Sequence, residues 1–557
     1  MISIEMKKTF NKTTLLSSFF SIFILVALLL TVVTAFALGG GGLPDTIAIE
    51  GGKISGLALG ENKDVLTFKG IPYAKPPVGP LRWKPPQPVE DWEGIRQSTE
   101  YGPACLQPDF PGWTLKHEKR SEDCLYLNVW TAAKSTDEKR PVMMWIHGGG
   151  NIIGAAHLST PIGNDCEALA RQGVVVVSIN YRLGAFGYFA HPLLSKESQH
   201  NVSGNYGLLD QIAALKWIQN NIKTFGGDPG NVTIFGESAG ATNVCYLTVS
   251  PLAKGLFHRA IAESGGAFFI PANRHLREGW YGMEPMEKQG ERITKDIGCA
   301  EAADPLAALR ALSAEKLLEG SKAVMMPPGN LFTPVVDGWV FPDEVMTIFE
   351  QGKHNAVPLV AGTNADEMSI FVPKSPFPSV DAYRGFLKVS YRTFADEVFA
   401  MYPAKEPSEI LKAFRDVLAD HAFVAPARRF VRAMDKAGSK AYLYHFTMTG
   451  LGPMAVLGAF HSNEIVFVFN DIERVKNTFK VPFEGKHQAL ANTMSAYWVQ
   501  FAKTGNPNKE GLPEWPVYDA AKDQYIELGE VVKAGQELRK EKLDLWDKFY
   551  TENRKTR

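Results

Sequence analysis

The stretch FGESAGA, residues 235–241, contains the pattern G-x-S-x-G with Ser238 at its centre. The run NVTIF (231–235) ends as this pattern begins, and its β-branched and aromatic residues are typical of a buried strand. The segment AGATNVCYLTV that follows Ser238 begins with small residues and continues with apolar ones, which favours a helix. A strand, a tight turn at a serine and a helix are what a nucleophile elbow requires.

The turn itself constrains the residues around Ser238. It is so tight that the positions two before and two after the serine must lack bulk, and Gly236 and Gly240 occupy them. The alternative is a glycine-rich strand-to-helix turn in which the serine has no catalytic role. So short a pattern also occurs by chance. The two readings differ in whether the rest of the chain supplies a base, an acid and oxyanion donors.

The order of elements predicts an α/β fold with a large, mostly parallel central sheet. Strand patterns alternate with helix patterns, which implies parallel pairing and right-handed crossovers. Ligands in such sheets bind at the carboxyl ends of strands, where Ser238 stands. We expect strands at 141–146, 174–179, 232–235, 357–361 and 441–446, a helix at 166–172, and an amphipathic helix at 208–225 with Leu209, Ile212, Leu215, Ile218 and Ile222 at helical spacing.

Two further regions are helix-rich, about 279–326 and much of 380–436, and we interpret them as insertions that roof a pocket. Residues 533–557 are polar and mixed in charge, and they predict a surface helix and tail. No internal repeat is visible, and large α/β enzymes reach this length as one unit. We therefore expect a single domain over residues 45–550.

Composition limits the function. The chain has 557 residues, 45% hydrophobic and 21% charged, with a formal net charge of −1. This balance is typical of a globular protein, and it lacks the basic excess that attracts nucleic acid. We therefore expect no nucleic-acid partner.

The N-terminus predicts export. Lys7, Lys8 and Lys12 precede an apolar stretch from Leu15 to Ala37, which ends in Ala35-Phe36-Ala37 and is followed by four glycines. This pattern predicts a signal peptide over residues 1–37, so that the body is secreted or periplasmic. The apolar stretch is long, so an uncleaved N-terminal membrane anchor is the alternative. No later segment has a comparable apolar span.

The five cysteines fit an exported chain. Cys105 and Cys124 enclose a polar loop, and a bridge across it would stabilise the fold by about 3 kcal/mol in the chain-entropy account. Cys166, Cys245 and Cys299 lie in apolar or helical surroundings that favour buried thiols. The alternative for the pair is two more free thiols. We find no C-x-x-C and no pair of histidines at ligand spacing, so we expect no metal.

A serine nucleophile needs donors for the oxyanion that its attack creates. The segment WIHGGG (145–150) directly follows a predicted strand, and its glycines let backbone N–H groups approach a substrate. Gly149 and Gly150 are the expected donors, together with the N–H of Ala239 after the serine. The alternative is a plain flexible turn.

The base and the acid are expected after the serine in such folds. Beyond His354 the chain has His421, His445, His461 and His487. His461 stands in a loop before an apolar run, GAFHSNEIVFVF, which is the natural position of the base. The others lie in helix-like or strand-like stretches. The acid is expected in VAGTNADE (360–367), where spacing alone does not choose between Asp366 and Glu367.

Together these segments resemble the type-B carboxylesterases, the family of cholinesterases, liver carboxylesterases and bacterial para-nitrobenzyl esterases. The resemblance covers roughly residues 51–502 and implies an α/β-hydrolase fold with helical insertions over the active site. It also implies that Glu367 is the acid, His461 the base, and Gly149, Gly150 and Ala239 the oxyanion donors. The matching segments are FKGIPYAKPPVGPLRW, SEDCLYLNVW, WIHGGG, INYRLGAFGY, GNYGLLDQIAALKWIQNNIKTFGGDPGNVTIFGESAGA, HRAIAESGG, VAGTNADE and HSNEIVFVF.

The resemblance further implies a disulfide between Cys105 and Cys124, whereas Cys299 lacks its usual partner and is expected to be free. Three residues match a buried layer behind the catalytic residues in the family: Glu237, Ser264 and Glu464. Three aromatic residues match or extend the substrate pocket: Phe371, Phe268 and Phe269.

The sequence departs from the family pattern at two places. Met368 follows the acid where the family usually has glycine, and the loop between Cys105 and Cys124 is shorter than in cholinesterases. Trp113 is only a loose match to their choline-binding tryptophan, so choline esters are not the expected substrates.

The expected function is that of a serine hydrolase that cleaves small-molecule carboxylic esters through an acyl-enzyme, without a cofactor. Three alternatives stay open: a lipase or polymer esterase that acts at interfaces, a non-catalytic binding protein on the same fold, and an amidase. The oligomeric state and the natural ester are not determined by the sequence.

Overall fold

We describe a computed structural model over residues 43–109, 119–157, 165–269, 272–325, 332–480 and 484–554. The expected signal peptide or anchor, residues 1–37, and the loosely matched Trp113 lie outside these ranges. Everything below concerns the unit Pro44–Arg557.

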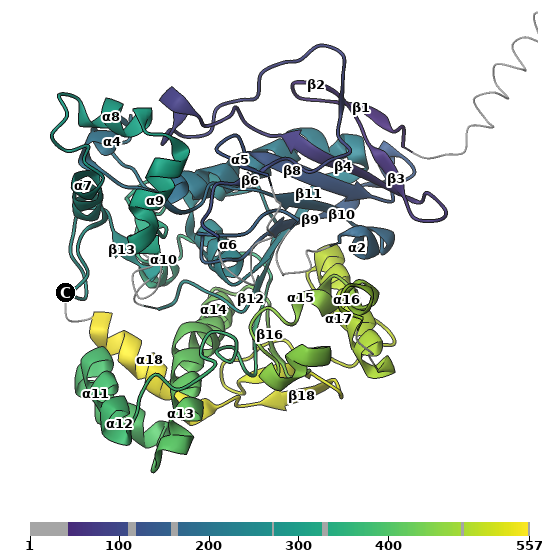
Figure 1. The fold of residues 1–557 in the computed structure, drawn as a ribbon. Coiled ribbons are helices and arrows are strands. Elements are labelled where there is room, and N and C mark those ends of the chain that lie inside the picture. Colours follow the sequence, from purple (N-terminus) through teal and green to yellow (C-terminus); the bar gives the residue numbers. More distant parts are fainter. Residues whose placement is uncertain are drawn as a thin grey trace, which may run out of the picture. The chain divides into compact units, whose positions relative to one another are not determined.

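The described residues contain an 11-stranded sheet in the order β18-β17-β16-β15-β12-β11-β9-β10-β8-β4-β3 (Figure 1). The stretch from β17 to β10 is parallel throughout, and the outer pairs are antiparallel, which agrees with the expected mostly parallel sheet. Its strands are β3 (Leu57–Leu59), β4 (Val65–Pro72), β8 (Tyr126–Thr131), β9 (Arg140–Ile146), β10 (Val175–Ile179), β11 (Gly227–Glu237), β12 (Arg259–Glu263), β15 (Leu359–Asn364), β16 (Ala441–Phe446), β17 (Gln524–Leu528) and β18 (Lys533–Gln536).

Three small sheets accompany the large one in the part of the chain described. They consist of β1 (Thr46–Ile49), β2 (Gly52–Ser55) and β5 (Ile95–Gln97); β6 (Ala104–Cys105) and β7 (Arg120–Ser121); and β13 (Arg274–His275) and β14 (Val335–Val336). The pair β6 and β7 lies beside the disulfide between Cys105 and Cys124, whose Cα atoms are 5.0 Å apart. This confirms the expected bridge, and Cys166, Cys245 and Cys299 are buried thiols outside it, as predicted.

Helices connect the strands and form the two predicted insertions. The insertions contain α7 to α9 and α11 to α14, so both helix-rich regions are confirmed. The α-helices are α2 (Glu167–Arg171), α3 (Gly184–Tyr188), α4 (Pro192–Glu197), α5 (Tyr206–Asn221), α6 (Ala239–Val249), α7 (Met286–Asp296), α8 (Pro305–Ala311), α9 (Ala314–Met325), α10 (Val345–Glu350), α11 (Val380–Tyr391), α12 (Ala395–Met401), α13 (Pro407–Ala419), α14 (Ala425–Lys436), α15 (Ile465–Val468), α16 (Ile472–Phe479), α17 (Gly485–Thr504) and α18 (Lys540–Arg554).

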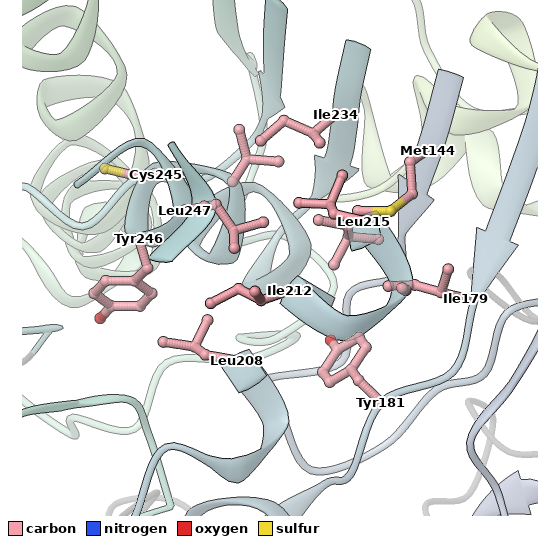
Figure 2. Packing of buried hydrophobic residues seen from close by; sticks show 14 of the residues in the cluster. Met144, Ile179, Tyr181, Leu208, Ile212, Leu215, Ile234, Cys245, Tyr246 and Leu247 are labelled. Atoms are coloured by element: carbon pink, nitrogen blue, oxygen red, sulfur yellow. The ribbon is translucent and has the colours of Figure 1, made fainter. Parts of the chain in front are cut away.

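The central strands are buried on both faces. Along β9, Val142, Met144 and Ile146 join one hydrophobic cluster, whereas Met143 and Trp145 join a second one across the sheet. A parallel sheet covered on both sides needs such continuous apolar runs, which is why period-two alternation is absent there. Figure 2 shows the first cluster, in which Leu208, Ile212 and Leu215 of α5 lie among residues of β9, β10, β11 and α6.

The expectation of an amphipathic helix at 208–225 was wrong in two respects. The α-helix ends at Asn221, and a 3₁₀ turn, η3 (Ile222–Phe225), continues it. The helix is buried on nearly every side, and its polar residue Asp210 forms an ion pair with Arg182 at 2.7 Å rather than facing water. A charged residue within a helix therefore did not mark a solvent face, because a buried cation neutralises it.

The C-terminal expectation also needs correction. Residues 533–536 form the edge strand β18, which pairs with β17, and α18 is not a simple surface helix. Its residues Leu543, Trp546 and Phe549 are buried in a third hydrophobic cluster with α11 to α13. Strand β11 likewise begins at Gly227, earlier than the predicted 232.

Candidate active site

Ser238 lies directly after the carboxyl end of β11, at the N-cap of α6. Its backbone has φ 57° and ψ −120°, a conformation that costs a non-glycine residue about 1–3 kcal/mol and persists only where surrounding structure holds it. Its N–H donates to the carbonyl oxygen of Glu263 on β12 at 2.8 Å, and its carbonyl oxygen accepts from Thr242 N at 3.0 Å. The strand–turn–helix arrangement expected around Ser238 is present.

The glycines beside Ser238 are required by close backbone contacts. A Cβ at Gly240 would lie 2.0 Å from the carbonyl oxygen of Ile146, and one at Gly236 would lie 2.5 Å from the same atom. Both distances are far below any real Cβ contact, so the inference that these positions must lack bulk is confirmed. Gly148 is also confined, since a Cβ there would lie 2.9 Å from the carbonyl oxygen of Glu237 and 3.1 Å from the Cβ of Ser238. The WIHGGG segment and the elbow therefore touch each other.

The structure separates the two adjacent carboxylates that spacing left open. Oε2 of Glu367 lies 2.5 Å from Nδ1 of His461, and both side chains are buried. Oε1 of Glu367 accepts from the backbone N–H of Asn364 at 2.7 Å. Asp366 points elsewhere, because its Oδ2 accepts from the N–H of Ala459 at 2.9 Å. Glu367 is thus the carboxylate that orients the His461 ring.

The other three C-terminal histidines have different surroundings. His421 packs against aromatic rings of Tyr391 and Trp546, and burial lowers its pKa to about 4. Burial likewise lowers the pKa of His445, which lies in β16, to about 3. His487 caps the N-terminus of α17. Of these four histidines, His461 is the one in contact with carboxylates.

The second ring nitrogen of His461 faces the residue before Ser238. Nε2 lies 3.1 Å from Oε1 of Glu237, and the same oxygen accepts from Ser462 Oγ at 2.5 Å. Burial alone would lower the pKa of His461, but the carboxylates of Glu237 and Glu367 raise it to about 9. Burial raises the pKa of Glu237 to about 7. Among the hydrogen bonds of the described residues there is none between Ser238 Oγ and His461.

A layer of buried polar residues lies behind these groups. Ser264 Oγ donates to Oε1 of Glu464 at 3.2 Å, and Asn364 Nδ2 donates to the other oxygen of Glu464. Burial raises the pKa of Glu464 to about 8, and the nearby charge of Glu237 adds to this. Glu237, Ser264 and Glu464 are all almost completely buried. Asn364, which also donates to Phe460 O at 2.8 Å, was not identified from the sequence, although it directly precedes ADE.

The expected oxyanion donors lie around the elbow. Gly149 and Gly150 have φ of 98° and 66°, conformations that favour glycine. Ala239 opens α6, so its N–H has no partner within the helix. In the described part of the chain, none of these three N–H groups donates to another protein atom. They are available to an anion beside Ser238, and the positive end of the α6 dipole favours one there.

Two aromatic rings flank His461. The ring centroid of Phe371 lies 5.1 Å from that of His461, and the side chain is 47% exposed. The ring centroid of Phe423, which belongs to the second helix-rich insertion, lies 4.8 Å from that of His461. Phe423 was missed from the sequence because it lies in the π-helical turn η7 (Asp420–Val424), which helical periodicity does not reveal. Such turns are frequent at functional sites.

Phe268 and Phe269 lie in different surroundings. Phe268 is buried between the rings of Phe349 and Phe430, with centroids 5.4 Å and 5.3 Å away. Both residues line a small cavity with Trp280, Arg429 and other side chains. Neither shows a ring contact with His461 in the described residues, so their assignment to the substrate pocket stays a prediction.

Within the described ranges, no group of three or more His, Cys, Asp or Glu side chains is arranged to hold a metal ion. None of the helices there is long and apolar enough to span a membrane.

Comparisons with known proteins identify the family. The sequence profile of the Carboxylesterase family matches residues 44–546. The medium-chain fatty acyl-CoA hydrolase precursor of Anas platyrhynchos is 37% identical over 517 residues, covering 87% of this chain and 88% of that protein. The fumonisin B1 esterase of Sphingopyxis macrogoltabida is 35% identical over 518 residues, covering 90% of this chain and 91% of that protein.

Solved structures agree. A thermophilic PNB esterase is 33% identical, covers 90% of this chain and 99% of its own, and superposes with a TM-score of 0.78. Together with the α/β sheet described above, these matches establish the α/β-hydrolase fold. The chain belongs to the carboxylesterase family and is a carboxylic ester hydrolase.

Proposed function

We propose that the protein cleaves small-molecule carboxylic esters through an acyl-enzyme on Ser238, with His461 as base and Glu367 as its orienting acid. One observation carries the proposal above the others. Nδ1 of His461 lies 2.5 Å from Glu367, while its Nε2 faces the residue that directly precedes Ser238. A histidine held on one nitrogen by a carboxylate, with its other nitrogen next to the residue that precedes the serine, can activate the serine hydroxyl once that nitrogen turns from Glu237 to Ser238.

In the proposed reaction, Ser238 Oγ attacks the ester carbonyl carbon as His461 Nε2 accepts its proton. Glu367 keeps the remaining ring proton on Nδ1 and stabilises the imidazolium that forms. His461 then donates the proton to the leaving alcohol, and the acyl group stays on Ser238. Water, activated by the same histidine, hydrolyses the acyl-enzyme and restores the serine. No cofactor takes part in any step.

The free N–H groups of Gly149, Gly150 and Ala239 support the assignment of the oxyanion site. Charge on the substrate oxygen develops only in the transition state, so donors fixed in advance lower the barrier without reorganisation. Losing one such donor typically costs about 2.7–4 kcal/mol. His147 supports this loop, since its Nδ1 lies 2.8 Å from Gly148 O and its ring stacks on Tyr181 at 4.4 Å.

The activation of His461 requires a change in one contact. For His461 to accept a proton it must be neutral, and Nε2 must turn from Glu237 toward Ser238 Oγ. Catalytic hydrogen bonds are often loose in the free enzyme and tighten in the substrate complex. We propose that a buried layer behind the catalytic residues, as in the family pattern, controls the charge of His461. This layer consists of Glu237, Ser264 and Glu464.

The substrate is proposed to be an ester with an apolar part. Phe371 and Phe423 flank His461 and offer ring faces to an acyl or alcohol chain. The relatives named above include a medium-chain fatty acyl-CoA hydrolase and a fumonisin B1 esterase, and the similar structure is a PNB esterase. These names favour carboxylic esters and thioesters of varied shape over choline esters.

The test uses para-nitrophenyl esters from acetate to octanoate with the wild type and Ser238→Ala. We expect a burst of nitrophenol equal to the enzyme concentration in the wild type, and no burst and no turnover in the variant. An organophosphate should label the wild type once, at Ser238. Substantial hydrolysis by folded Ser238→Ala would contradict the mechanism, and an inert wild type would favour a binding protein on the same fold.

Action at a lipid or polymer interface is a second candidate, favoured by one observation. The turn η8 (Gly452–Leu457) exposes Met454 and Val456, at 37% and 88%, and its Leu457 carbonyl accepts from Ser369 near Glu367. An exposed apolar turn next to the site is suited to an apolar surface. A rate that jumps as the ester exceeds its solubility would support this candidate, and a hyperbolic rate through that concentration would contradict it.

We also propose that the chain is exported and that residues 45–550 act as one domain. The disulfide supports export, because such bonds persist in oxidising compartments. Whether residues 1–37 are removed or anchor the chain is decided by the mass of the protein recovered from the producing cell. A mature N-terminus at Leu38 is expected, and an intact N-terminus in the membrane fraction would favour the anchor.

A further inference from the structure

A carboxyl group that the proposed mechanism does not use lies directly behind the nucleophile. Glu263 is the last residue of β12 and pairs in register with Glu237 of β11. Its backbone carbonyl oxygen accepts the N–H of Ser238 at 2.8 Å. The backbone of Glu263 therefore holds Ser238, whose φ of 57° and ψ of −120° lie outside the commonly populated backbone conformations.

The side chain of Glu263 is anchored to a helix across the sheet. It is fully buried, and its Oε1 accepts from the indole N–H of Trp498 on α17 at 2.7 Å. Its Oε2 is buried and has no hydrogen-bond partner among the described residues. A buried carboxylate with an unpartnered oxygen is costly, whereas the protonated acid leaves no uncompensated charge.

The surroundings of Glu263 carry negative charge already. Glu237 and Glu464 face it from β11 and from the loop before α15, and Tyr444 Oη on β16, also buried without a partner, lies within its electrostatic reach. Burial raises the pKa of Glu263 well above its ordinary value, and the charges of Glu464 and Glu237 act in the same direction. Glu237 and Glu464 also act on His461, whose pKa their charges raise.

We propose that Glu263 is a neutral, protonated positioning residue, which ties the strained Ser238 backbone to Trp498 of α17 and adds no charge to the His461 site. The inference rests on the proposed function, because positioning Ser238 matters only if Ser238 is the nucleophile. A neutral acid suits this position for a physical reason: it accepts the indole N–H on one oxygen, and it leaves the charge balance of Glu237, Glu367 and His461 unchanged.

The test compares Glu263→Gln, Glu263→Leu and the wild type. Glutamine is the neutral isostere and keeps an oxygen for Trp498, so kcat, KM and the pH profile of kcat/KM should match the wild type. Leucine fills the space but cannot hold the indole, so kcat should fall by roughly 10²-fold through misplacement of Ser238, with KM little changed. Equal loss in both variants, or a pH profile displaced in Glu263→Gln, would overturn the neutral assignment.

A second variant covers the case in which Glu263→Leu does not fold. Trp498→Phe keeps an aromatic ring but removes the N–H that donates to Oε1, together with part of the indole. We expect a smaller fall in kcat than in Glu263→Leu, again without a shift of the pH profile. Unchanged kcat in Trp498→Phe, or in folded Glu263→Leu, would contradict a positioning role.

Organophosphate labelling separates this inference from the proposed function. A wild type that is not labelled at Ser238 would contradict the proposed function itself. A wild type that is labelled, together with Glu263→Leu labelled at the same rate, would contradict only the role of Glu263. Slower labelling of Glu263→Leu, restored in Glu263→Gln, is the expected result.

Discussion

Oε1 of Glu237 lies 3.1 Å from Nε2 of His461, the nitrogen that receives the proton of Ser238 in the proposed mechanism. Because Glu237 directly precedes Ser238, the carboxylate that now contacts Nε2 and the hydroxyl that is proposed to replace it belong to adjacent positions of the chain. The carboxylate stabilises the protonated ring and so opposes its action as a base. The pH at which His461 becomes neutral should therefore depend on Glu237.

The first prediction concerns Glu237→Gln. Removing this carboxylate lowers the pKa of His461 from about 9, so the ring becomes neutral at a lower pH. The rising limb of kcat/KM against pH should move to lower pH with para-nitrophenyl acetate. Lys316→Gln, an exposed change in α9, serves as a control and should leave the limb in place. A limb unmoved in Glu237→Gln would show that another group sets it.

The direction in which the free energy of unfolding changes with pH follows from the same raised pKa of His461. A folded-state pKa raised above the ordinary 6.5 contributes stability that is fully present below 6.5 and is lost as the pH rises through about 9. The contribution of His461 to the free energy of unfolding should thus decline across this window in the wild type. The decline should be smaller in Glu237→Gln, as measured by denaturant unfolding at several pH values.

The second prediction contrasts the two adjacent carboxylates. Glu367→Gln removes the acceptor for Nδ1 of His461 and should lower kcat by about 10⁴-fold, the loss typical when a triad acid is replaced by its amide. Asp366→Asn changes a group whose Oδ2 accepts from Ala459 N, so it should cost about 1 kcal/mol of stability and little activity. Equal losses of kcat in the two variants would contradict the assignment of Glu367.

The third prediction concerns the elbow glycine. Gly240→Ala places a Cβ 2.0 Å from the carbonyl oxygen of Ile146, a backbone atom of a central strand that cannot move aside. We expect a loss of about 1–3 kcal/mol of stability, together with a fall in kcat. Gly385→Ala is the matched control, because it lies exposed in α11 with no atom within 4 Å of its new Cβ. It should stabilise the fold by about 0.5–1 kcal/mol. Stability unchanged in Gly240→Ala would contradict the contact.

The fourth prediction concerns the disulfide. Replacing both Cys105 and Cys124 with serine removes a cross-link between positions 19 apart and should lower the free energy of unfolding by about 3 kcal/mol. Denaturant unfolding without reductant measures this difference. Cys299→Ser, a change at a free buried thiol, is the control for losing a cysteine side chain, and reductant should bring the wild type to the stability of the double variant. Equal stability of the wild type and the double variant would show that the bridge contributes nothing.

Much of the fold followed from local sequence patterns. The strands at 141–146, 174–179 and 441–446 were predicted within one residue, because strands buried on both faces have nearly continuous apolar runs. The elbow at Ser238 and the glycines around it could equally be predicted from the sequence, because a tight turn allows few residue types. Helix 208–225 and the C-terminal segment were misjudged, because Asp210 is neutralised by Arg182 and α18 is buried by α11 to α13, distant parts of the chain.

The sequence by itself determined the family, the positions of most strands and helices along the chain, and the residue types of the site, because these depend on short segments and on their order. The tertiary structure placed Glu367, the acid that the family resemblance implied, against Nδ1 of His461, where spacing alone had left Asp366 open. Only the tertiary structure showed that Glu237 lies against Nε2 of His461, that the ring of Phe423 lies beside the His461 ring, and that Glu263 accepts the N–H of Ser238. These relations join residues up to hundreds of positions apart. Their distances are set by how strands and helices pack, and local pattern carries no information about that packing.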